Sequence, residues 1–317
     1  MSVKSPMKIV LLDARTLGSD LDLAPLEACG NITCYQTTDA SETEERIADA
    51  EIVITNKVPI TEALMQRAPR LKLICIAATG MNNVDLPAAE AYNISVKNVT
   101  GYATRSVTQH TFSMALYLLE QMRYYDQRVK SGAWEASQLF TDISRPFYEI
   151  AGKKWGIIGL GSIGREVARV ATAFGAEVCY HSTSGKNRNR DYPHLSLESL
   201  LETCDIVSIH APLNAQTHNL INHKNLSCLK EGSLLLNLGR GGIVNETDLA
   251  EAMHHQTFYA GLDVLEEEPL KSTHPLLHIP HPQRLLITPH MAWASFEARE
   301  TLLQALVDNI KHFLEAQ

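Results

Sequence analysis

A glycine-spaced turn near the middle of this 317-residue chain constrains its fold more than any other feature. A short apolar run, residues 154–158, leads into Gly159-Leu160-Gly161-Ser162-Ile163-Gly164, and a helical pattern follows from Arg165 to Phe174. This order predicts a strand, a tight turn and a helix. The first glycine allows the turn, the second lets the backbone approach a pyrophosphate, and the third lets the helix pack on the strand. Because a helix N-terminus also attracts phosphate, the segment predicts a dinucleotide site. The alternative is a glycine-rich turn of any α/β domain.

Composition narrows the class of protein. The chain is 45% apolar and 20% charged, which is typical of a soluble globular protein, and its length suits about two domains. The net charge of −8 leaves no basic surface for nucleic acid and argues against binding to anionic membranes. No apolar run approaches the roughly 18 residues of a membrane span. We therefore expect no nucleic acid and no membrane as partner.

The cysteines and the N-terminal residues indicate the cellular compartment and whether a metal site is expected. The six cysteines form no Cys-x-x-Cys pair and no cluster with histidine at zinc-ligand spacing, so no metal site is predicted. Residues 1–6 lead into a short strand without the apolar region of a signal peptide. These observations predict reduced thiols and a cytoplasmic location.

Strands alternate with helices along the chain, which predicts parallel sheets covered by helices. The first series of expected strands is 8–12, 32–35, 51–55, 71–77 and 94–97, with helices at 43–50, 61–67 and 86–92. The second series of strands is 155–158, 177–180, 206–210, 234–238, 259–263 and 285–288, with helices at 197–202, 224–228, 246–254 and 295–315. The predicted fold class is therefore α/β, with two parallel-sheet units in series and the glycine motif opening the second.

A long helical pattern joins the two series. Residues 106–130 read as one helix, with apolar residues on more than one face. Such a helix is expected to be buried on several sides, between domains or between subunits. We expect it to form a homodimer contact, although burial within one chain produces the same pattern.

Three residues after strand ends are candidates for chemistry. Arg240 follows one strand, and an arginine there can donate two parallel hydrogen bonds to a carboxylate. Glu268, fixed by the following proline, and His290, after the last strand, complete the set. Each has a structural alternative: a surface arginine in a glycine turn, a solvated acidic run over 266–268, and a structural histidine.

Together the three residues fit one reaction. A carboxylate beside a histidine favours the protonated imidazole, which can donate a proton to a developing alkoxide and take it back in reverse. The arginine holds a substrate carboxylate, and a nicotinamide supplies the hydride. Reduction of a 2-keto acid to a 2-hydroxy acid needs these parts.

At this point the sequence resembles the D-isomer-specific 2-hydroxyacid dehydrogenases over nearly its whole length. The matching motifs are the glycine motif, His210-Ala211-Pro212-Leu213, residues 237–242, residues 261–269, and Thr288-Pro289-His290. The resemblance assigns the catalytic roles to Arg240, Glu268 and His290. It also implies that Asp263 meets the nicotinamide end of the cofactor and that the loop Ala78-Thr79-Gly80 meets the substrate carboxylate.

The resemblance also fixes the expected domains and contacts. It implies a Rossmann cofactor domain, residues 104–293, inserted into a flavodoxin-like substrate domain, residues 1–103 and 294–317. The expected substrate-binding residues are Asn56, Ala78, Thr79, Gly80, Arg240, His290 and Trp293. The expected cofactor-binding residues are Gly159, Leu160, Gly161, Ser162, Ile163, Gly164, Ser182, Thr183, Ser184, Lys186, His210, Ala211, Pro212, Thr217, Leu238, Gly239 and Asp263.

Within the family, residues 55–58 and 290–294 look most like the glycerate dehydrogenase or hydroxypyruvate reductase branch. This implies a small substrate such as hydroxypyruvate or glyoxylate. Trp293 could wall a small pocket or could pack in the core at a helix start. The alternatives are a reductase of bulkier 2-keto acids and a non-catalytic protein of the same fold that binds nucleotide.

The strand after the glycine motif departs from the usual NAD pattern. An acidic residue about 20 residues after the glycines normally binds the ribose 2′-hydroxyl, but Ser182 stands there. No acid repels a 2′-phosphate, and nearby hydroxyls with Lys186 or Arg188 could bind one. This favours NADP(H) over NAD(H); the alternative is a polar loop without a role in selection.

Overall fold

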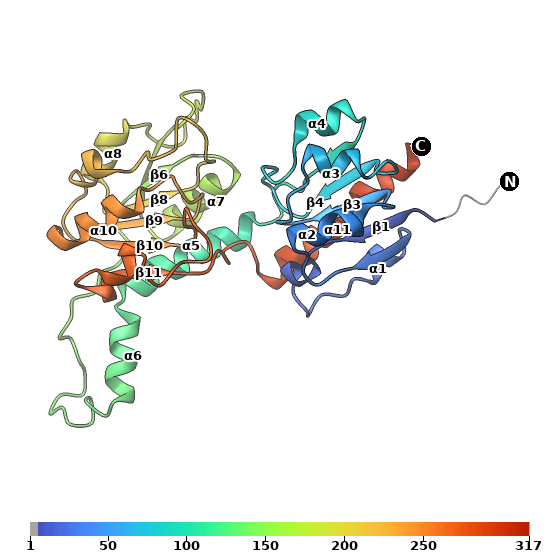
Figure 1. The fold of residues 1–317 in the computed structure, drawn as a ribbon. Coiled ribbons are helices and arrows are strands. Elements are labelled where there is room, and N and C mark those ends of the chain that lie inside the picture. The colour runs from blue at the N-terminus through green and yellow to red at the C-terminus, as the bar shows by residue number, and fades with distance from the viewer. Residues whose placement is uncertain (1–5, 317) are drawn as a thin grey trace. The chain divides into compact units, whose positions relative to one another are not determined.

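The computed structural model describes residues 6–316, so the N-terminal segment that we expect to lack a signal peptide lies outside the described residues except for Pro6. The chain divides into two compact units, Met1–Ala103 with Ala294–Gln317 (unit 1) and Thr104–Trp293 (unit 2). Each unit contains a parallel sheet flanked by helices (Figure 1). The predicted α/β fold class with two parallel sheets is confirmed. No helix among residues 6–316 is long and apolar enough to span a bilayer.

The sheet of unit 1 has five parallel strands in the order β2-β1-β3-β4-β5. They are β1 (Lys8–Leu11), β2 (Asn31–Cys34), β3 (Ile52–Thr55), β4 (Leu73–Ile76) and β5 (Ser95–Lys97). The helices of this unit are η1 (Ala14–Leu17), α1 (Ala24–Glu27), α2 (Ala40–Ile47), α3 (Glu62–Gln66), α4 (Leu86–Ala91) and α11 (Phe296–Glu315).

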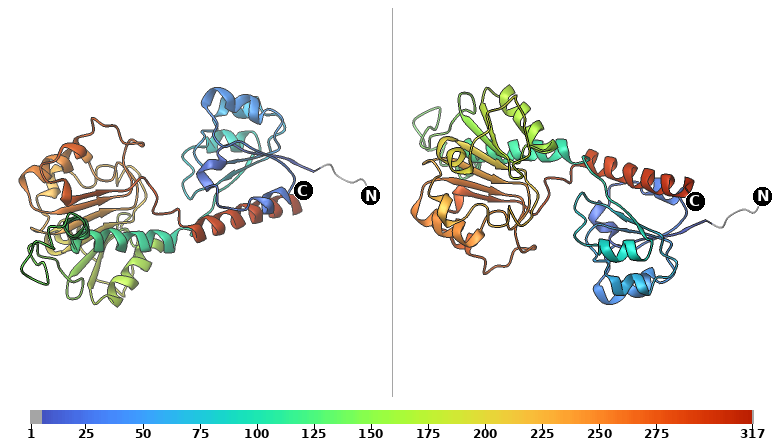
Figure 2. Two further views of the ribbon diagram at one scale, coloured as in Figure 1. Left: turned by 90° about the horizontal axis from the view of Figure 1, so that it is seen from below. Right: turned by 90° about the horizontal axis from the view of Figure 1, so that it is seen from above.

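Burial explains why unit 1 forms two helical layers around its sheet. All residues of β3 and β4 are buried, because helices cover both faces of the parallel sheet. Helix α11 lies along one face, with Leu302, Leu306 and Ile310 buried (Figure 2). Helix α2 begins three residues earlier than predicted, because Asp39 and Glu42 form a reciprocal capping box at its start.

The sheet of unit 2 has six parallel strands in the order β11-β10-β9-β8-β6-β7. They are β6 (Lys154–Ile158), β7 (Glu177–His181), β8 (Ile206–Ile209), β9 (Leu234–Asn237), β10 (Tyr259–Leu262) and β11 (Leu285–Ile287). Its helices are α5 (Thr104–Leu119), α6 (Met122–Lys130), α7 (Ser162–Ala173), α8 (Leu197–Thr203), α9 (His223–Leu226), α10 (Glu246–His255), η2 (Pro275–His278) and η3 (Pro282–Arg284).

The prediction of one helix over 106–130 is wrong. Gln121 adopts a left-handed conformation (φ 52°, ψ 35°), which ends α5 and starts α6. Seven residues of α5 are buried, whereas none of α6 is, and α6 projects away from the sheet of unit 2 (Figure 1). The expectation of burial on several sides therefore holds for α5 alone.

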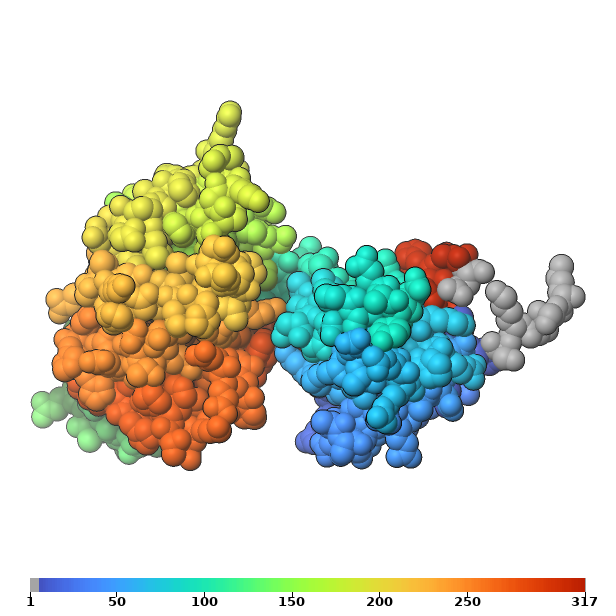
Figure 3. Space-filling view, turned by 45° about the horizontal axis from the view of Figure 1, so that its top comes forward, coloured from blue at the N-terminus to red at the C-terminus, as the bar shows by residue number. Residues whose placement is uncertain are grey.

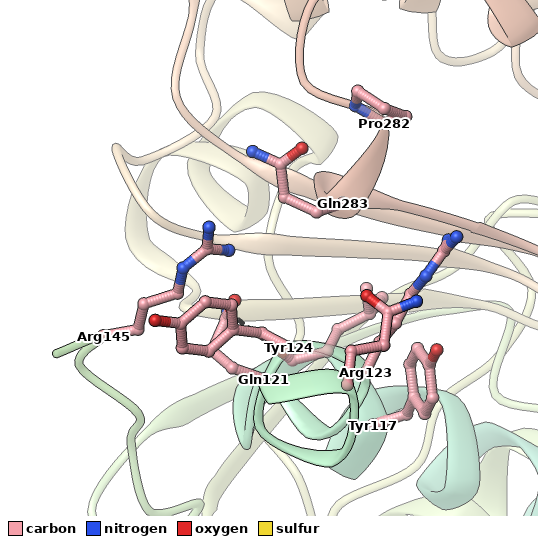
Figure 4. Close-up of a pocket in the computed structure, with 9 residues that line it drawn as sticks. Tyr117, Gln121, Arg123, Tyr124, Arg145, Pro282 and Gln283 are labelled. Carbon is pink, nitrogen blue, oxygen red and sulfur yellow. Dashed lines mark hydrogen bonds between the residues drawn. The ribbon is translucent and has the colours of Figure 1, made fainter. Parts of the chain in front are cut away.

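A polar pocket of about 280 Å³ lies at the bend between α5 and α6 (Figure 4). Tyr117, Gln121 and Tyr124 line it from the two helices, and Arg145 comes from the segment that returns after α6. The Arg145 guanidinium stacks 3.9 Å from the centre of the Tyr124 ring. This stacking ties the returning segment to α6.

Candidate active site

The sheet order of unit 2 reverses between β6 and β8, because β7 lies on one side of β6 and β8 on the other. Gly159, Ser182 and His210 directly follow β6, β7 and β8. The carboxyl ends of parallel strands meet at one edge of a sheet, and ligands of open α/β sheets bind where the strand order reverses. The topology therefore brings the predicted cofactor segments together at the expected place.

The glycines of the motif allow close backbone approach. Gly159 has φ +92°, and a Cβ there would lie 2.8 Å from the backbone nitrogen of Ala211. A Cβ on Gly164 would lie 2.3 Å from the Gly159 carbonyl oxygen, so this glycine lets α7 pack on the loop. A Cβ on Gly161 would meet no atom within 4 Å. The loop therefore leaves open space beside Gly161, at the N-terminus of the twelve-residue helix α7.

A cavity of about 510 Å³ lies over this loop. Lys186 is the one charged residue that lines it, so its lining is free of acidic side chains. Its lining residues are Gly159, Leu160, Gly161, Ser182, Thr183, Ser184, Lys186, Asn187, His210, Pro212, Asn214 and Gln216.

Three of these lining residues, Asn187, Asn214 and Gln216, were missed by sequence reasoning. The Asn187 side chain donates to the Leu160 carbonyl (2.8 Å), and its backbone N–H donates to Ser182 Oγ (3.3 Å). These bonds fold the loop after β7 back onto the glycine motif, while its tip projects from unit 2 (Figure 3). No sequence pattern signals such a long-range side-chain bond.

His210 has an unusual environment in this cavity. The residue as a whole is partly exposed, but both ring nitrogens are buried without a hydrogen-bond partner. Burial lowers the pKa of His210 to about 3, so the ring is neutral at physiological pH. A buried nitrogen without a partner costs free energy unless a ligand bonds it. The open space at Gly161, the α7 N-terminus and this imidazole together fit a phosphate-containing dinucleotide.

Apart from Asp263, the predicted cofactor residues that do not line the cavity belong to segments adjoining its lining residues. Ser162 and Ile163 form the first turn of α7, and Ala211 packs against Gly159. Thr217 is fully buried; its hydroxyl donates to the Pro212 carbonyl (2.7 Å) and accepts from the Asn214 N–H (2.8 Å). Thr217 therefore holds the loop that carries Asn214 and Gln216. Leu238 is buried, and Gly239 packs against the carbonyl of Ala211.

Glu268 and His290 are joined by a hydrogen bond. The distance between Glu268 Oε2 and His290 Nδ1 is 2.8 Å, and both side chains are partly exposed (36% and 24%). The second oxygen of Glu268 accepts from the backbone N–H of Leu265 (2.9 Å). The sequence prediction that an acid lies beside His290 is thus met by the geometry. The bond at Nδ1 leaves Nε2 as the ring nitrogen that can face a substrate.

The backbone at His290 is strained and is held by Asp263. His290 has φ +52°, which is uncommon for a residue other than glycine and is often found at functional sites. Asp263 is 2% exposed and accepts from the backbone N–H groups of Met291 and Ala292 (2.9 Å each) and from Thr288 Oγ1 (2.6 Å). Asp263 therefore fixes the chain on both sides of His290.

His110 of α5 extends this network and was also missed. Its Nε2 lies 3.1 Å from Thr288 Oγ1 and 3.6 Å from Asp263 Oδ1. The sequence could not indicate it, because His110 stands 178 residues before Thr288 within an ordinary helical pattern.

Arg240 is exposed in the loop after β9, and β9 pairs with β10, the strand that precedes Asp263. Its Nη1 donates to the neighbouring Gly239 carbonyl (2.9 Å), and its own carbonyl accepts from the Asn237 side chain (2.9 Å). The bond from Asn237 therefore fixes the backbone of this loop, while the Arg240 guanidinium stays accessible to solvent. Trp293, at the end of unit 2, is half-buried.

The other predicted substrate residues belong to unit 1. Asn56 follows β3 and is 5% exposed; its backbone N–H donates to Asp13, and its carbonyl accepts from Asn83. The loop 78–80 follows the neighbouring strand β4, and the Thr79 hydroxyl donates to the Val99 carbonyl (3.0 Å). Both segments lie at the carboxyl edge of the same sheet.

Fold and site together define a nucleotide-binding α/β protein with a histidine–carboxylate pair on the cofactor-binding sheet. Residues 112–292 match the family model described as D-isomer specific 2-hydroxyacid dehydrogenase, NAD binding domain. The chain therefore belongs to the D-isomer specific 2-hydroxyacid dehydrogenase family.

Individual relatives agree with this assignment over nearly full length. A hydroxypyruvate reductase of Blautia hydrogenotrophica is 36% identical over 98% of this chain and 97% of its own. A glycerate dehydrogenase of Methylorubrum extorquens is 36% identical over 97% of this chain and 96% of its own. The crystal structure of a D-lactate dehydrogenase from Aquifex aeolicus, complexed with NAD and lactic acid, is 27% identical with a TM-score of 0.83, covering 97% of this chain and 96% of that one.

Proposed function

We propose that this protein is a D-2-hydroxyacid dehydrogenase that reversibly reduces a small 2-keto acid, of the hydroxypyruvate or glyoxylate class, with NAD(P)H. The observation that carries the proposal is the 2.8 Å bond between Glu268 and His290 on the sheet that bears the dinucleotide cavity. The relatives named hydroxypyruvate reductase and glycerate dehydrogenase support the small substrate.

The roles of the three residues follow from their chemistry. When bound, the nicotinamide cofactor supplies the hydride that reduces the keto carbon. His290 donates the proton to the oxygen of the same carbonyl from Nε2 and accepts it in the reverse reaction. Glu268 bonds Nδ1, which orients the ring and stabilises its protonated form. Arg240 binds the substrate carboxylate through its guanidinium.

The experiment that tests the function is initial-rate kinetics with hydroxypyruvate, with NADH and NADPH compared at equal concentration. Turnover with either cofactor supports the dehydrogenase. If only bulkier 2-keto acids react, the alternative substrate class is correct. If the purified protein binds cofactor but turns over no keto acid, the proposal fails in favour of a non-catalytic nucleotide-binding protein.

Arg240→Ala tests the carboxylate contact within this function. We expect KM for the keto acid to rise by about 100-fold, since a charge-assisted bidentate pair is lost, with cofactor affinity unchanged. Arg15→Ala, an exposed arginine of unit 1, is the matched control. An unchanged KM would remove Arg240 from the site.

We further propose that NADPH is preferred. Ser182, Thr183, Ser184 and Lys186 line the cavity beyond β7, and its lining includes no acid to repel a 2′-phosphate. Lys186→Gln should lower the NADPH/NADH ratio of kcat/KM by about tenfold, because a phosphate–cation contact is lost. Lys224→Gln, an exposed lysine of α9, is the charge-matched control. A ratio that already favours NADH in the unaltered protein would show that the loop does not select NADPH.

We also propose a homodimer formed through α6 and the segment that returns to the sheet. Among residues 6–316, eight of the fifteen exposed large hydrophobic side chains lie between 122 and 148, and Phe140 is 90% exposed. Such a patch is typical of an interaction site. Phe140→Asp should shift the mass in solution from dimer to monomer, while Leu277→Asp, elsewhere on unit 2, should not.

We propose a cytoplasmic location as well, which fractionation of the native cell would test.

A further inference from the structure

The buried Glu246 and the partly buried His274 form a pair to which the proposed function assigns no role. Glu246 is the first residue of α10 and is 7% exposed. Its Oε2 lies 2.9 Å from His274 Nε2. His274 caps η2, where its Nδ1 accepts the backbone N–H of Leu276 (3.3 Å). Because Nδ1 is an acceptor there, Nε2 carries the hydrogen and donates to Glu246.

The other oxygen of Glu246 reaches the loop that carries Glu268. Glu246 Oε1 accepts the backbone N–H of Glu266 at 2.7 Å. The N–H of the preceding residue, Leu265, is bonded to Glu268 itself. Two successive amides of one loop therefore bind two carboxylates. The Leu265 amide binds Glu268, which bonds His290, and the Glu266 amide binds Glu246.

The same loop is held on another side by the turn that carries Arg240. A Cβ on Gly241 would lie 1.9 Å from the Leu265 carbonyl oxygen, so the two loops pack backbone to backbone. The Leu265–Glu266 peptide is therefore fixed between Gly241 and Glu246. A displacement of this peptide would move Glu268, and it would loosen the packing beside Arg240.

The charge balance explains why the pair has to stay intact. Burial raises the pKa of Glu246, and the hydrogen bond from the Glu266 N–H and the contact with His274 offset this rise only in part. A buried carboxylate that loses one donor leaves an uncompensated polar group, which destabilises its surroundings.

We propose that Glu246 and His274 are positioning residues, which hold the 264–268 loop so that Glu268 stays hydrogen-bonded to His290. This inference rests on the proposed function, because it assigns the pair a role in orienting the proton donor. It is independent of the cofactor and of the identity of the keto acid.

Glu246→Gln is the variant that tests the pair. Both groups that face the Glu246 oxygens are N–H donors, so the amide NH₂ of glutamine must face one of them and one bond is lost. Asp248→Asn is the matched control: Asp248 also stands in the first turn of α10 and bonds a histidine, His223, through its backbone N–H (2.8 Å) and ring (3.3 Å). Among residues 6–316, the hydrogen bonds of this pair join α9 to the first turn of α10 and do not involve the 264–268 loop.

We expect kcat of Glu246→Gln to fall roughly 10- to 100-fold, since displacing a catalytic group by about 1 Å has an effect of this size. Cofactor Kd should stay unchanged, and Asp248→Asn should match the unaltered protein. In the Glu268→Gln background, Glu246→Gln should add less than about threefold, because the two residues act as one unit. Hydrogen exchange at the amides of residues 265 and 266 should be faster in Glu246→Gln than in the unaltered protein, and it should be unchanged in Asp248→Asn.

Two outcomes would overturn the inference. One is a kcat of Glu246→Gln within twofold of the control; the other is a full additional loss in the Glu268→Gln background, which indicates a general structural role. If Glu246→Gln does not fold, His274→Leu, which removes the donor to Glu246, is measured instead with the same expectations. Absence of keto-acid turnover in the unaltered protein would instead refute the proposed function, and the exchange rates at 265 and 266 would then show separately whether the pair holds the loop.

Discussion

The sheets of the two units share the strand order 2-1-3-4-5, which unit 2 extends by a sixth strand, but they differ at the carboxyl end of the first strand. In unit 1, β1 is followed by Asp13, which is 5% exposed and accepts the backbone N–H groups of Asn56 and Lys57 after β3. In unit 2, β6 is followed by Gly159, whose missing side chain lets the backbone of Ala211 after β8 pack against it. An aspartate therefore occupies the carboxyl end of β1 in unit 1, while glycines keep the carboxyl end of β6 in unit 2 open.

The two sheet edges also differ in whether their buried polar groups have hydrogen-bond partners. The amides after β3 have a carboxylate partner, whereas the His210 nitrogens after β8 have no partner among the described residues. Sheet topology thus provides the same edge twice, and the residues that follow the first strand decide whether a phosphate can approach the end of that strand. Four experiments break or sharpen this comparison.

The largest effect is expected at the reactive end of the unit 2 edge. His290→Ala should lower kcat by about 10²–10⁴, because general acid–base catalysis contributes a factor of this size. Cofactor affinity should change little. His281→Ala, an exposed histidine of the same unit, serves as control. Turnover of His290→Ala close to that of the control would contradict the assigned role.

Removing the closure of the unit 1 edge should destabilise that unit. Two carboxylate oxygens of Asp13 now accept three bonds of 2.7–3.1 Å from two backbone amides, and Asp13→Asn replaces one of these oxygens with an NH₂ group that cannot accept. We expect a loss of about 1–3 kcal/mol in the free energy of unfolding, measured by denaturant titration. Asp22→Asn, at an exposed site, is the control. Equal stability of the two variants would show that the aspartate does not close the edge.

Partly filling the open edge should impair binding without affecting folding. A Cβ on Gly161 meets no protein atom within 4 Å, and its φ of −82° suits alanine. Gly161→Ala should therefore keep the melting temperature but weaken NADPH binding by about tenfold, or roughly 1.4 kcal/mol, measured by calorimetry. Unchanged affinity would mean that the cofactor does not approach this glycine.

The smallest effect concerns acid stability. The folded pKa of His210, about 3, lies below its ordinary value of 6.5, so the unfolded chain binds the proton more strongly. Stability from this group is present above pH 6.5 and is lost as the pH falls, by about 1.4 kcal/mol per pH unit until the folded pKa is reached. His210→Asn should reduce the acid loss between pH 6.5 and 5.5, measured by thermal melts. Parallel melting curves for both proteins would contradict the burial of these nitrogens.

Much of the fold was predictable because parallel strands have a strong local signal. The eleven strands observed over residues 6–316 coincide with the predicted ones within two residues at either end, since buried parallel strands read as short apolar runs. The break at Gln121 was not predictable, because a left-handed backbone at a glutamine has no sequence signature. The helix start at Ala40 was misplaced because a capping box, rather than apolar periodicity, set it.

For the site, the sequence by itself determined which residues meet at the sheet edge. Gly159, Ser182, His210, Asp263 and His290 each follow a strand, and parallel topology alone brings strand ends together. Tertiary structure decided what each of them bonds. Asn187 over Leu160, His110 beside Thr288, and Glu246 with His274 join segments 27, 178 and 28 residues apart. Side-chain pairs of this kind depend on how loops pack in three dimensions, which local patterns of residues do not encode.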